Sequence, residues 1–436
     1  MRRAVSDVGY FQLLKENKPF RRLFTADMIS YVGDWFTVIA LFILAGEATD
    51  NSPLAIAGVL VTRSFGMALC DPFSGMFADR YSRKGLMMLS NFISLVALVS
   101  VVAFDLLNNL FSYYFLAFVM VLAKSLFDPA EFSYLPKICT NDELITANAL
   151  GSGGWSVALG IGAGIGGLTI SEFGVTTALW IDCSTFLLSI LIIASLPPGG
   201  PDNPVTGRLT PKSAILEIIS GWKYIRSKPP VRRVVFAKGM WASGGGAQVF
   251  LLILIGMETD FGELAAGIGL LFMIRGFGSG FGPIIAKPLM KQKQILPYLL
   301  GVSVGVAGIF YVFVSQIEWT NLLLVFVFCA HASSGVNWVY STTMLQTRSD
   351  DEWRGRVAGT DYLVITFTMG CSALAAALIL EYQLLELREV IAITGAIQIA
   401  LGILWVLLAS PSEKKLFCLL YTSDAADEGL GVDLGG

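Results

Sequence analysis

Residues 53–84 of the chain read PLAIAGVLVTRSFGMALCDPFSGMFADRYSRK. The part from 53 to 77 is almost entirely apolar, and about 20 such residues are enough to cross a lipid bilayer as a helix. Three bases, Arg80, Arg83 and Lys84, follow before a second apolar run begins. Lys and Arg concentrate in the cytoplasmic loops of membrane proteins. This stretch therefore predicts a membrane-spanning helix followed by a basic cytoplasmic loop.

The composition of the whole chain supports this interpretation. Of 436 residues, 55% are hydrophobic and only 14% are charged, and the mean hydropathy is +0.68. Soluble domains carry roughly 25% charged residues. The composition therefore excludes an intrinsically disordered chain and argues against a soluble globular enzyme. The net charge of -3 says little, because in a membrane protein the side that each charge occupies is what matters.

Apolar runs of spanning length follow one another along the chain, and the longest polar break divides them six and six. They lie at 23–45, 53–77, 85–105, 111–132, 148–171, 175–196, 234–256, 264–286, 295–315, 321–344, 357–380 and 388–409. The break contains a stretch near 213–226 with helical periodicity, which we expect to lie on the membrane surface as an amphipathic helix.

These runs predict five segments of the chain. We expect a cytoplasmic N-terminal segment at 1–22, a six-helix bundle at 23–196, a cytoplasmic linker at 197–233, a second six-helix bundle at 234–410 and a tail at 411–436. From about Cys418 the tail resembles a translated sequencing-library adaptor. We therefore expect that part to be an artefact rather than native sequence, so that the native C-terminus is missing.

The positive charges are sorted by side. Nearly all Lys and Arg residues fall in the N-terminal segment, in the even-numbered loops and in the C-terminal tail, whereas Arg388 lies on the other side. Four more bases lie inside the predicted helices, at Arg63, Lys124, Lys238 and Arg275. This bias predicts a multi-pass protein of the cytoplasmic (inner) membrane with both termini in the cytoplasm.

The two halves of the chain resemble each other. PFRRLF at 19–24 recurs as PVRRVV at 230–235, an offset of 211, and RSFG at 63–66 recurs as RGFG at 275–278, an offset of 212. Both pairs occupy matching places before or within a predicted helix, in the same orientation. The sequence thus predicts an all-α membrane protein whose twelve helices form two parallel-repeat six-helix bundles.

The loop after the second predicted helix carries a recognisable motif. Gly75, Asp79, Arg80, Arg83 and Lys84 resemble the helix 2–3 signature of the major facilitator superfamily, although Ser82 stands where that signature usually has Gly. The resemblance implies the major facilitator fold and a gating role for these five residues. A generic basic loop is the alternative.

Other segments resemble one branch of that superfamily, the drug:proton antiporter-3 branch with its macrolide-type efflux permeases. They are NKPFRRLF at 17–24 with SYVGDW at 30–35, FDPA at 127–130 with LP at 135–136 and ANAL at 147–150, and QTR at 346–348 with RGRV at 354–357. The resemblance implies proton-coupled export, and the direction of transport rests on it alone.

The fifth predicted helix is rich in glycine. Gly162, Gly166 and Gly167 resemble the exporter-type signature of this helix, except that Ala163 replaces its proline. The functional interpretation is a bendable, closely packed helix between the bundles. Ordinary packing of small residues explains the same pattern equally well.

Charged residues inside the predicted helices are the best candidates for a mechanism, because an unpaired charge at the bilayer centre costs at least about 2.5–3.5 kcal/mol. With a rise of about 1.5 Å per residue, Asp34 lies roughly 18 Å and Arg63 roughly 15 Å inside the membrane. The two are expected at similar depth on neighbouring helices. We hypothesise that Asp34 is the proton-coupling carboxylate and Arg63 its partner. A permanent structural ion pair is an equal alternative.

Four further residues within the spans have open roles. Asp27 and Lys238 share the offset of 211 and form a possible inter-bundle pair, although solvation at the membrane edge is favoured. Arg275 is a further transport candidate, which either attracts an anionic substrate group or pairs with an acid elsewhere. His331 is either a proton carrier or, with more support, a neutral hydrogen-bonded side chain.

Other chemistries find little support. The six Cys residues have no ligand-like spacing, a single histidine leaves almost no room for a His-based metal site, and no phosphate-binding Gly-Lys-Ser/Thr loop occurs. We therefore expect no enzyme activity, no catalytic residues, no metal and no cofactor, with the proton gradient as energy source. The expected partners are a small-molecule substrate and the lipid bilayer, without nucleic acid, and the protein is expected to be a monomer.

The sequence therefore predicts a secondary active transporter that works by alternating access. The preferred function is proton-coupled efflux of hydrophobic or amphiphilic small molecules, of the multidrug or macrolide type. The alternatives are an importer or a lipid or lysophospholipid flippase on the same fold, and, with less support, a non-transporting membrane sensor.

Overall fold

The computed structural model describes residues 8–78, 80–200, 211–290, 292, 294–350 and 353–416. Within these ranges, twelve helices are long and apolar enough to cross a membrane. They are α2 (Lys18–Glu47), α3 (Pro53–Ala78), α4 (Arg83–Ala103), α5 (Leu110–Ile138), α6 (Asn141–Phe173), α7 (Val175–Ala194), α9 (Pro229–Glu258), α10 (Leu264–Ile285), α12 (Leu296–Gln316), α13 (Asn321–Arg348), α14 (Arg354–Glu381) and α15 (Leu387–Leu404).

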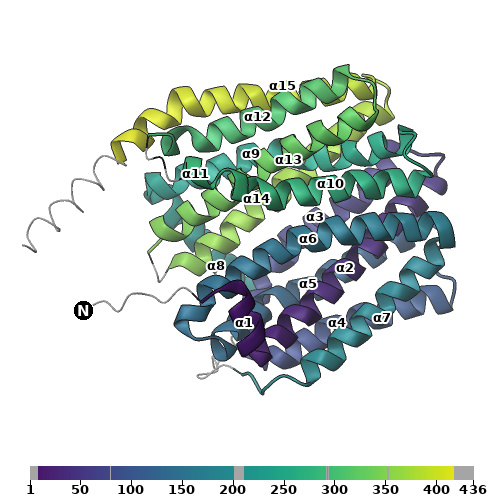
Figure 1. Cartoon of the computed structure of the whole chain (residues 1–436), viewed down its shortest axis with the longest axis vertical. Helices are drawn as coiled ribbons and strands as arrows, with labels where there is room; N and C mark the ends of the chain where they lie inside the picture. Colours follow the sequence, from purple (N-terminus) through teal and green to yellow (C-terminus); the bar gives the residue numbers. More distant parts are fainter. Residues whose placement is uncertain are drawn as a thin grey trace, which may run out of the picture.

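Shorter elements accompany these spans. They are α1 (Tyr10–Glu16), α8 (Pro211–Ser227), α11 (Lys287–Met290) and the π-helical turn η2 (Trp405–Ala409), which continues α15. α8 lies where the amphipathic linker helix was expected. The suspected adaptor-derived segment from about Cys418 lies outside the described residues. The predicted all-α membrane fold with two bundles of six helices is confirmed (Figure 1).

The starts of several spans are set by local capping groups. The side chain of Asn17 accepts a hydrogen bond from the backbone N–H of Phe20 at the start of α2, and that of Ser82 accepts one from Gly85 at the start of α4. Thr140 and Glu143 form a capping box at the start of α6. Such groups satisfy N–H donors that the first turn of a helix leaves unpaired.

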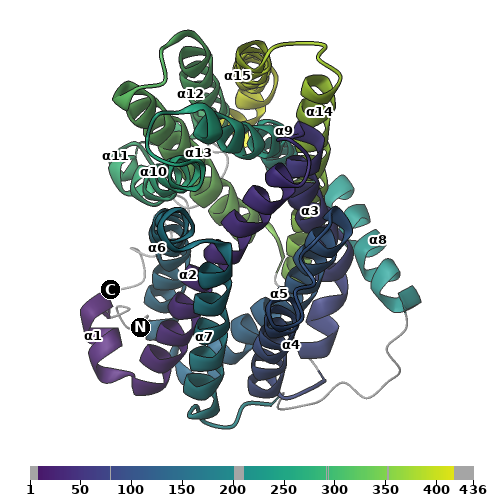
Figure 2. The same cartoon turned by 90° about the vertical axis from the view of Figure 1, so that its right-hand side faces the viewer.

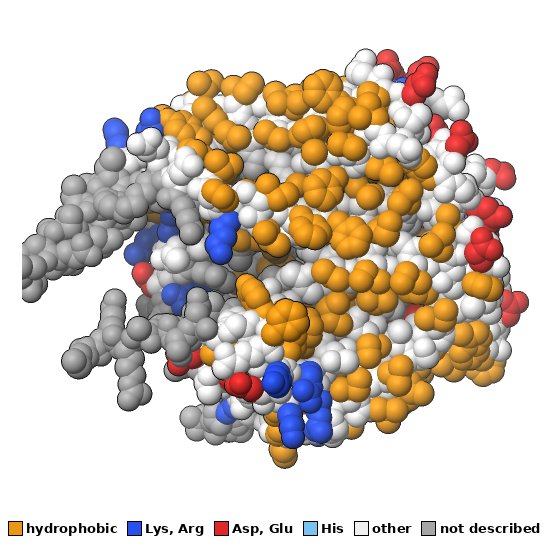
Figure 3. All heavy atoms as spheres, viewed as in Figure 1, with side chains coloured by type: hydrophobic (Ala, Val, Ile, Leu, Met, Phe, Trp, Pro, Cys, Tyr) orange, Lys and Arg blue, Asp and Glu red, His pale blue; other side chains and the backbone are white. Residues whose placement is uncertain are grey.

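The charges mark two different ends of the molecule. Figure 3 shows Lys and Arg side chains gathered at the end from which both described termini emerge, hydrophobic side chains over the middle, and Asp and Glu concentrated at the opposite end. We call the first the basic end; it carries α1 and α8. We call the second the acidic end; it carries Glu47, Glu172 and Glu258 at or next to the ends of α2, α6 and α9.

The two bundles contact each other through two equivalent pairs of helices. α3, the second span of the first bundle, packs against α14, the fifth span of the second bundle. In the same way α6, the fifth span of the first bundle, packs against α10, the second span of the second bundle. Figure 2 shows α6 beside α10. The repeat seen in the sequence is therefore preserved in the helix packing.

The glycines of α6 divide between its two neighbours. Gly162 and Gly166 face α2, where an added Cβ would lie 2.7 Å from the carbonyl oxygen of Val32 and 3.2 Å from Cα of Phe36. Gly167 faces α10 across the bundle interface, where an added Cβ would meet the carbonyl oxygen of Ala265. Small residues let helices approach closely in membranes, and both close approaches of α6 depend on them.

The apolar core is continuous at the acidic end and divided at the basic end. One large cluster joins residues of both bundles, including 38–43 of α2 and 249–255 of α9. Towards the basic end one separate cluster belongs to the first bundle, around Tyr134, and another to the second, around Trp405. The two bundles therefore share one apolar core at the acidic end and have separate apolar cores at the basic end.

Polar contacts between the bundles also lie at the acidic end. Ser52 Oγ donates to Glu381 Oε2 at 2.7 Å, and Ser171 Oγ donates to Glu263 Oε2 at 3.1 Å. Both bonds join the acidic ends of the interface helices, at α3 with α14 and at α6 with α10. Contacts between the spanning helices of the two bundles therefore concentrate at the acidic end, whereas the apolar core is divided at the basic end.

Candidate functional site

A cluster of ionisable side chains lies between α2 and α5 in the first bundle. Asp27, Tyr31 and Asp34 follow one another on α2 at spacings of four and three residues, and Lys124, Asp128 and Glu131 repeat the same spacing on α5. Residues so spaced share one face of a helix. We call these six residues the carboxylate cluster.

Lys124 joins the two faces of the carboxylate cluster. Its Nζ lies 3.2 Å from Asp128 Oδ1 and 3.6 Å from the centroid of the Tyr31 ring. A cation over an aromatic ring is attracted by the negative face of the ring. The side chain of Asp128 is 55% exposed and that of Lys124 is 25% exposed. This salt bridge is therefore partly exposed.

Asp27 and Glu131 form the deeper part of the carboxylate cluster. Asp27 is 5% exposed, and no N–H or hydroxyl donor of the described residues reaches its Oδ1. Its carboxyl group lies within electrostatic range of the carboxyl group of Glu131. Two carboxylates near each other repel when both are ionised.

The predicted partners Asp34 and Arg63 lie near each other without a direct ion pair. Asp34 interacts electrostatically with Arg63 and Lys124, and Arg63 also interacts with Asp182 of α7. No ion pair within 4 Å joins Asp34 to either base in the described part of the chain. Asp182 is fully buried and accepts hydrogen bonds from Thr37 and Thr185. Arg63 therefore lies in the field of two carboxylates.

The second bundle faces the carboxylate cluster with aromatic side chains. Tyr362 of α14 interacts electrostatically with Asp71 and Asp128 of the first bundle. Its ring centroid lies 6.0 Å from that of Trp338, which in turn lies 5.5 Å from that of Trp241. Acidic side chains of the first bundle and aromatic side chains of the second bundle thus lie near one another.

The predicted inter-bundle pair of Asp27 and Lys238 does not form, and that prediction is wrong for this structure. Lys238 Nζ lies 2.7 Å from Asp361 Oδ2 within the second bundle, and both side chains are almost fully buried, at 2% and 1% exposure. Asp27 instead lies within electrostatic range of Glu131 in the first bundle. A buried charge needs a partner close by, and Lys238 finds its partner within its own bundle.

Arg275 lies inside the second bundle without a carboxylate partner among the described residues. Its Nε and Nη1 atoms are buried and make no hydrogen bond there. The guanidinium carbon lies 5.4 Å from the centroid of the Phe272 ring. Tyr311 lies within electrostatic range, and its hydroxyl forms a hydrogen bond of 3.1 Å with Nε2 of His331.

Comparison with known proteins identifies the family to which the chain belongs. The sequence profile of the Major Facilitator Superfamily matches residues 23–369, most of the chain. The chain belongs to the Major Facilitator Superfamily. This result does not extend to the drug:proton antiporter-3 branch.

Relatives of known sequence agree with the superfamily assignment. The chain is 22% identical over 434 residues to the uncharacterized MFS-type transporter YfiS of Bacillus subtilis (strain 168), covering 95% of this chain and 99% of the relative. It is 25% identical over 305 residues to the putative bacilysin exporter BacE of the same organism, covering 68% of this chain and 73% of the relative.

Solved structures share the fold at low sequence identity. A peptide transporter POT in complex with sulfate superposes with a TM-score of 0.73 at 12% identity, covering 94% of this chain and 98% of the transporter. A bacterial homologue of the human lysosomal transporter Spinster, solved in an inward-facing and unoccupied conformation, superposes with a TM-score of 0.66 at 13% identity. The superposition covers 92% of this chain and 97% of the Spinster homologue.

The basic residues after α3 tie the basic end of the first bundle together. Arg83 Nη1 donates to the carbonyl oxygen of Ser133 at 2.8 Å, and Lys84 Nζ donates to the carbonyl oxygens of Ala194 and Leu196 at 2.7 Å each. Gly75 lies within α3 and Arg80 follows it. Asp79 lies outside the described residues.

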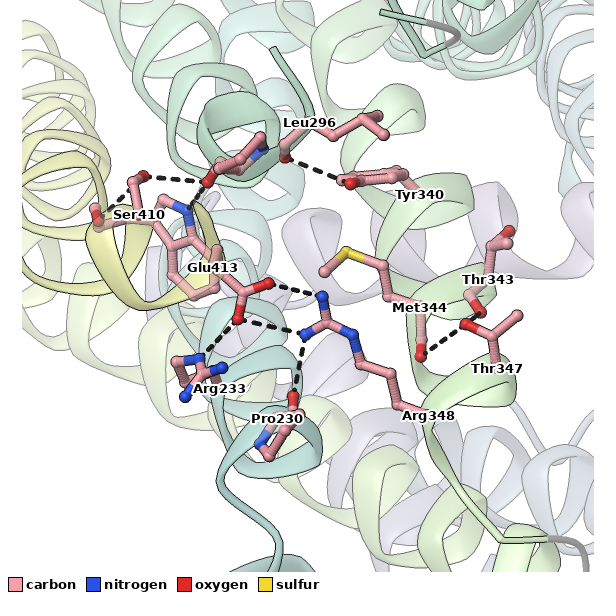
Figure 4. Close-up of polar contacts among 12 residues, drawn as sticks. Pro230, Arg233, Leu296, Tyr340, Thr343, Met344, Thr347, Arg348, Ser410 and Glu413 are labelled. Carbon is pink, nitrogen blue, oxygen red and sulfur yellow. Dashed lines mark hydrogen bonds and ion pairs between the residues drawn. The ribbon is translucent and has the colours of Figure 1, made fainter. Parts of the chain in front are cut away.

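A second polar group at the basic end was not predicted. The side chain of Glu413 is fully buried and lies 2.5 Å from Nε of Arg233 and 2.5 Å from Nη2 of Arg348 (Figure 4). Arg348 Nη1 also donates to the carbonyl oxygen of Pro230 at 3.1 Å. We call Glu413, Arg233 and Arg348 the buried triad. It joins α9, α13 and the segment after α15.

Proposed function

We propose that this member of the superfamily is a proton-coupled secondary transporter that exports hydrophobic or amphiphilic small molecules by alternating access. The observation that carries the proposal is the carboxylate cluster, which places four acids and one base within the membrane-spanning helices α2 and α5. Charges inside a membrane are costly and are kept where they bind an ion or a substrate. A non-transporting sensor would have little use for them.

The orientation supports loading from the cytoplasm. Lys and Arg gather at the basic end, and such a bias favours a cytoplasmic location for that end. We therefore propose that the termini are cytoplasmic, that the protein lies in the inner membrane and that this structure is the inward-facing state. One chain supplies both bundles, so a monomer is sufficient.

The acidic and aromatic side chains that lie near one another in the two bundles suit a substrate with an apolar body and a positive charge. Asp71 and Asp128 offer carboxylates, while Trp241, Trp338 and Tyr362 offer aromatic faces that attract cations and apolar groups. Arg275 remains a candidate for an anionic group of the substrate. The putative bacilysin exporter among the relatives favours export over import or lipid flipping.

We propose that Asp34 and Arg63 take part in the coupling. Protonation of Asp34 removes a negative charge from the field of Arg63 and leaves Asp182 as the remaining carboxylate there. Such a change alters the relative stability of the two states of an alternating-access transporter. We also propose a gating role for five residues at the end of the second span and in the loop after it, which would stabilise a closed basic end in the outward-facing state. They are Gly75, Asp79, Arg80, Arg83 and Lys84.

The decisive experiment is an efflux assay in cells that lack their own pumps. A panel of cationic, neutral and anionic amphiphiles is loaded, and retention is measured with and without a proton uncoupler. Uncoupler-sensitive export of at least one compound, lost in Asp34→Asn, is the expected result. Accumulation that requires the protein would favour an importer, and transbilayer movement of labelled lysophospholipid alone would favour a flippase.

A further inference from the structure

The linker helix α8 belongs to the basic end and is not a membrane span. It is not among the twelve helices that are long and apolar enough to cross a membrane. It contacts α14 and α9 of the second bundle and α3 of the first bundle, and Figure 2 shows it at the outside of the molecule. Because α3 also packs against α14, α8 lies against both helices of one interface between the bundles.

One face of α8 is fixed to the second bundle. The ring of Tyr224 stacks on that of Trp353, with 5.0 Å between the centroids and 10° between the planes. The hydroxyl of Tyr224 accepts a hydrogen bond of 3.0 Å from the backbone N–H of Asp350. At Gly221 an added Cβ would lie 2.7 Å from the carbonyl oxygen of Arg356 in α14. This face therefore holds the start of α14 and the loop before it.

Another face of α8 exposes large apolar side chains. Ile215, Ile219 and Trp222 follow one another at spacings of four and three residues, so they share one face of the helix. They are 49%, 43% and 51% exposed, and Leu216 beside them is 53% exposed. We call these four residues the apolar stripe. No other described element covers it, and such a stripe on a helix outside the bilayer core needs an apolar neighbour.

The same face carries positive charge. Arg226 lies one turn beyond Trp222, and both are exposed. Lys223 lies one turn beyond Ile219 and is also exposed. No carboxylate of the described residues forms an ion pair with either base. The acid of α8, Glu217, lies two residues from Ile219 and therefore points away from the stripe.

This combination specifies the depth at which α8 lies. The hydrocarbon core of a bilayer disfavours charged groups, and water disfavours the apolar stripe. The headgroup region accepts both, because apolar side chains reach the upper acyl chains while Lys and Arg lie beside anionic headgroups. Tryptophan is enriched at this depth.

We propose that α8 binds anionic phospholipids of the cytoplasmic leaflet, with the apolar stripe among the upper acyl chains and Lys223 and Arg226 beside the phosphate groups. The proposal rests on the proposed cytoplasmic location of the basic end, and not on proton coupling or export. Because the other face of α8 is fixed to the second bundle, the bound lipid also holds the start of α14 in place. Anionic lipid thereby stabilises the packing of α14 against α3 in this structure.

A fluorophore on the exposed face measures the lipid contact. The full-length protein, with its native cysteines replaced, carries Ile219→Cys labelled with an environment-sensitive dye and is placed in lipid nanodiscs. Phosphatidylglycerol then replaces increasing amounts of phosphatidylcholine. We expect the emission to move to shorter wavelength as phosphatidylglycerol is added. Glu217→Cys, an exposed position of the same helix away from the stripe, is the matched control and should change little.

The two bases provide a test of the charge dependence. A base beside an anionic leaflet strengthens binding about fivefold. Lys223→Gln combined with Arg226→Gln should therefore require at least about fivefold more phosphatidylglycerol for half of the emission shift. Lys15→Gln combined with Lys18→Gln removes two exposed bases at the same end of the molecule and should leave the titration unchanged.

Three results would overturn the binding of anionic lipid. A full emission shift in phosphatidylcholine alone would show that the stripe binds the membrane without anionic lipid. No shift in any lipid would show that this face does not contact the membrane. An unchanged titration in the variant without Lys223 and Arg226 would exclude these bases from the site.

Amide hydrogen exchange tests the connection to α14. We expect phosphatidylglycerol to slow exchange in residues 354–360 of the wild type. Tyr224→Leu removes the ring stack and the hydrogen bond to the loop, so it should abolish this effect, while the dye at position 219 reports whether α8 itself still binds lipid. Slowed exchange that persists in Tyr224→Leu would refute the connection through Tyr224. None of these measurements needs transport, so a failure of proton-coupled efflux and a failure of lipid binding are separate results.

Discussion

Replacing Glu413 by Gln should strongly destabilise the basic end of the second bundle. The side chain of Glu413 is fully buried, whereas those of Arg233 and Arg348 are 22% and 10% exposed. Gln keeps the shape but removes the charge, so that two guanidinium groups face each other without a carboxylate. Breaking a buried ion pair costs about 3–5 kcal/mol. Water still reaches Arg233, which places the expected loss near the lower limit, at about 3 kcal/mol.

The assay is thermal unfolding of the purified protein, followed by size-exclusion chromatography after heating. For a unit of about 200 residues, 1 kcal/mol shifts the midpoint by roughly 2–4 °C, so the variant should unfold roughly 6–12 °C earlier. Lys415→Gln, an exposed charge two residues away, is the control and should lie within about 0.5 kcal/mol of the wild type. An unchanged midpoint for Glu413→Gln would falsify the view that the buried triad holds α9, α13 and the end of the chain together.

Four further predictions concern other parts of the molecule. Gly167→Ala places a methyl group against the backbone of α10 and should cost about 1–3 kcal/mol in stability and reduce transport, measured by unfolding and efflux. Lys238→Met leaves Asp361 buried and unpaired and should cost about 3–5 kcal/mol, and the exchange of the two charges should recover part of that loss. Burial raises the pKa of Cys139 to about 12, so its thiolate fraction falls as pH falls below 12, and maleimide at neutral pH should label it only after unfolding. Asp34→Asn should abolish the pH dependence of export measured in proteoliposomes with an imposed gradient, and survival of that dependence would remove Asp34 from the coupling.

Much of the fold was predictable from the sequence. Hydropathy indicates which residues lie within the membrane, and the positions of Lys and Arg indicate on which side each loop lies. The lengths of the apolar runs and the sorting of the bases predicted the spans and the division into halves. The internal repeat extends to contacts. Arg22 at the start of the first bundle donates to the carbonyl oxygen of Ser195, just after α7, at 3.0 Å, and Arg233 at the same place in the second bundle reaches Glu413 after α15. In both halves the first spanning helix is thus joined to the end of the sixth.

The site was only partly predictable, because depth does not specify the direction in which a side chain points. The rise per residue placed Asp34 and Arg63 at similar depth, and the structure brings them into the same electrostatic field. Asp27 and Lys238 were matched by repeat position, but equivalent positions need not lie near each other, and each found its partner in its own bundle. One usable signal was overlooked. The spacing of Lys124, Asp128 and Glu131 is identical to that of Asp27, Tyr31 and Asp34 on α2, and it indicated a facing pair of polar helix surfaces.

The position of the carboxylate cluster limits how it can act on the rest of the protein. Both of its helices belong to the first bundle, so a proton gained or lost there changes the second bundle only through groups that face it across the gap. Tyr362 is such a group, because it lies in the field of Asp71 and Asp128 while its ring stands 6.0 Å from that of Trp338. If the cluster drives the change of state, Tyr362→Phe should weaken the proton dependence of export in proteoliposomes while the protein stays folded. Proton dependence that survives in Tyr362→Phe would show that the two bundles communicate by another route.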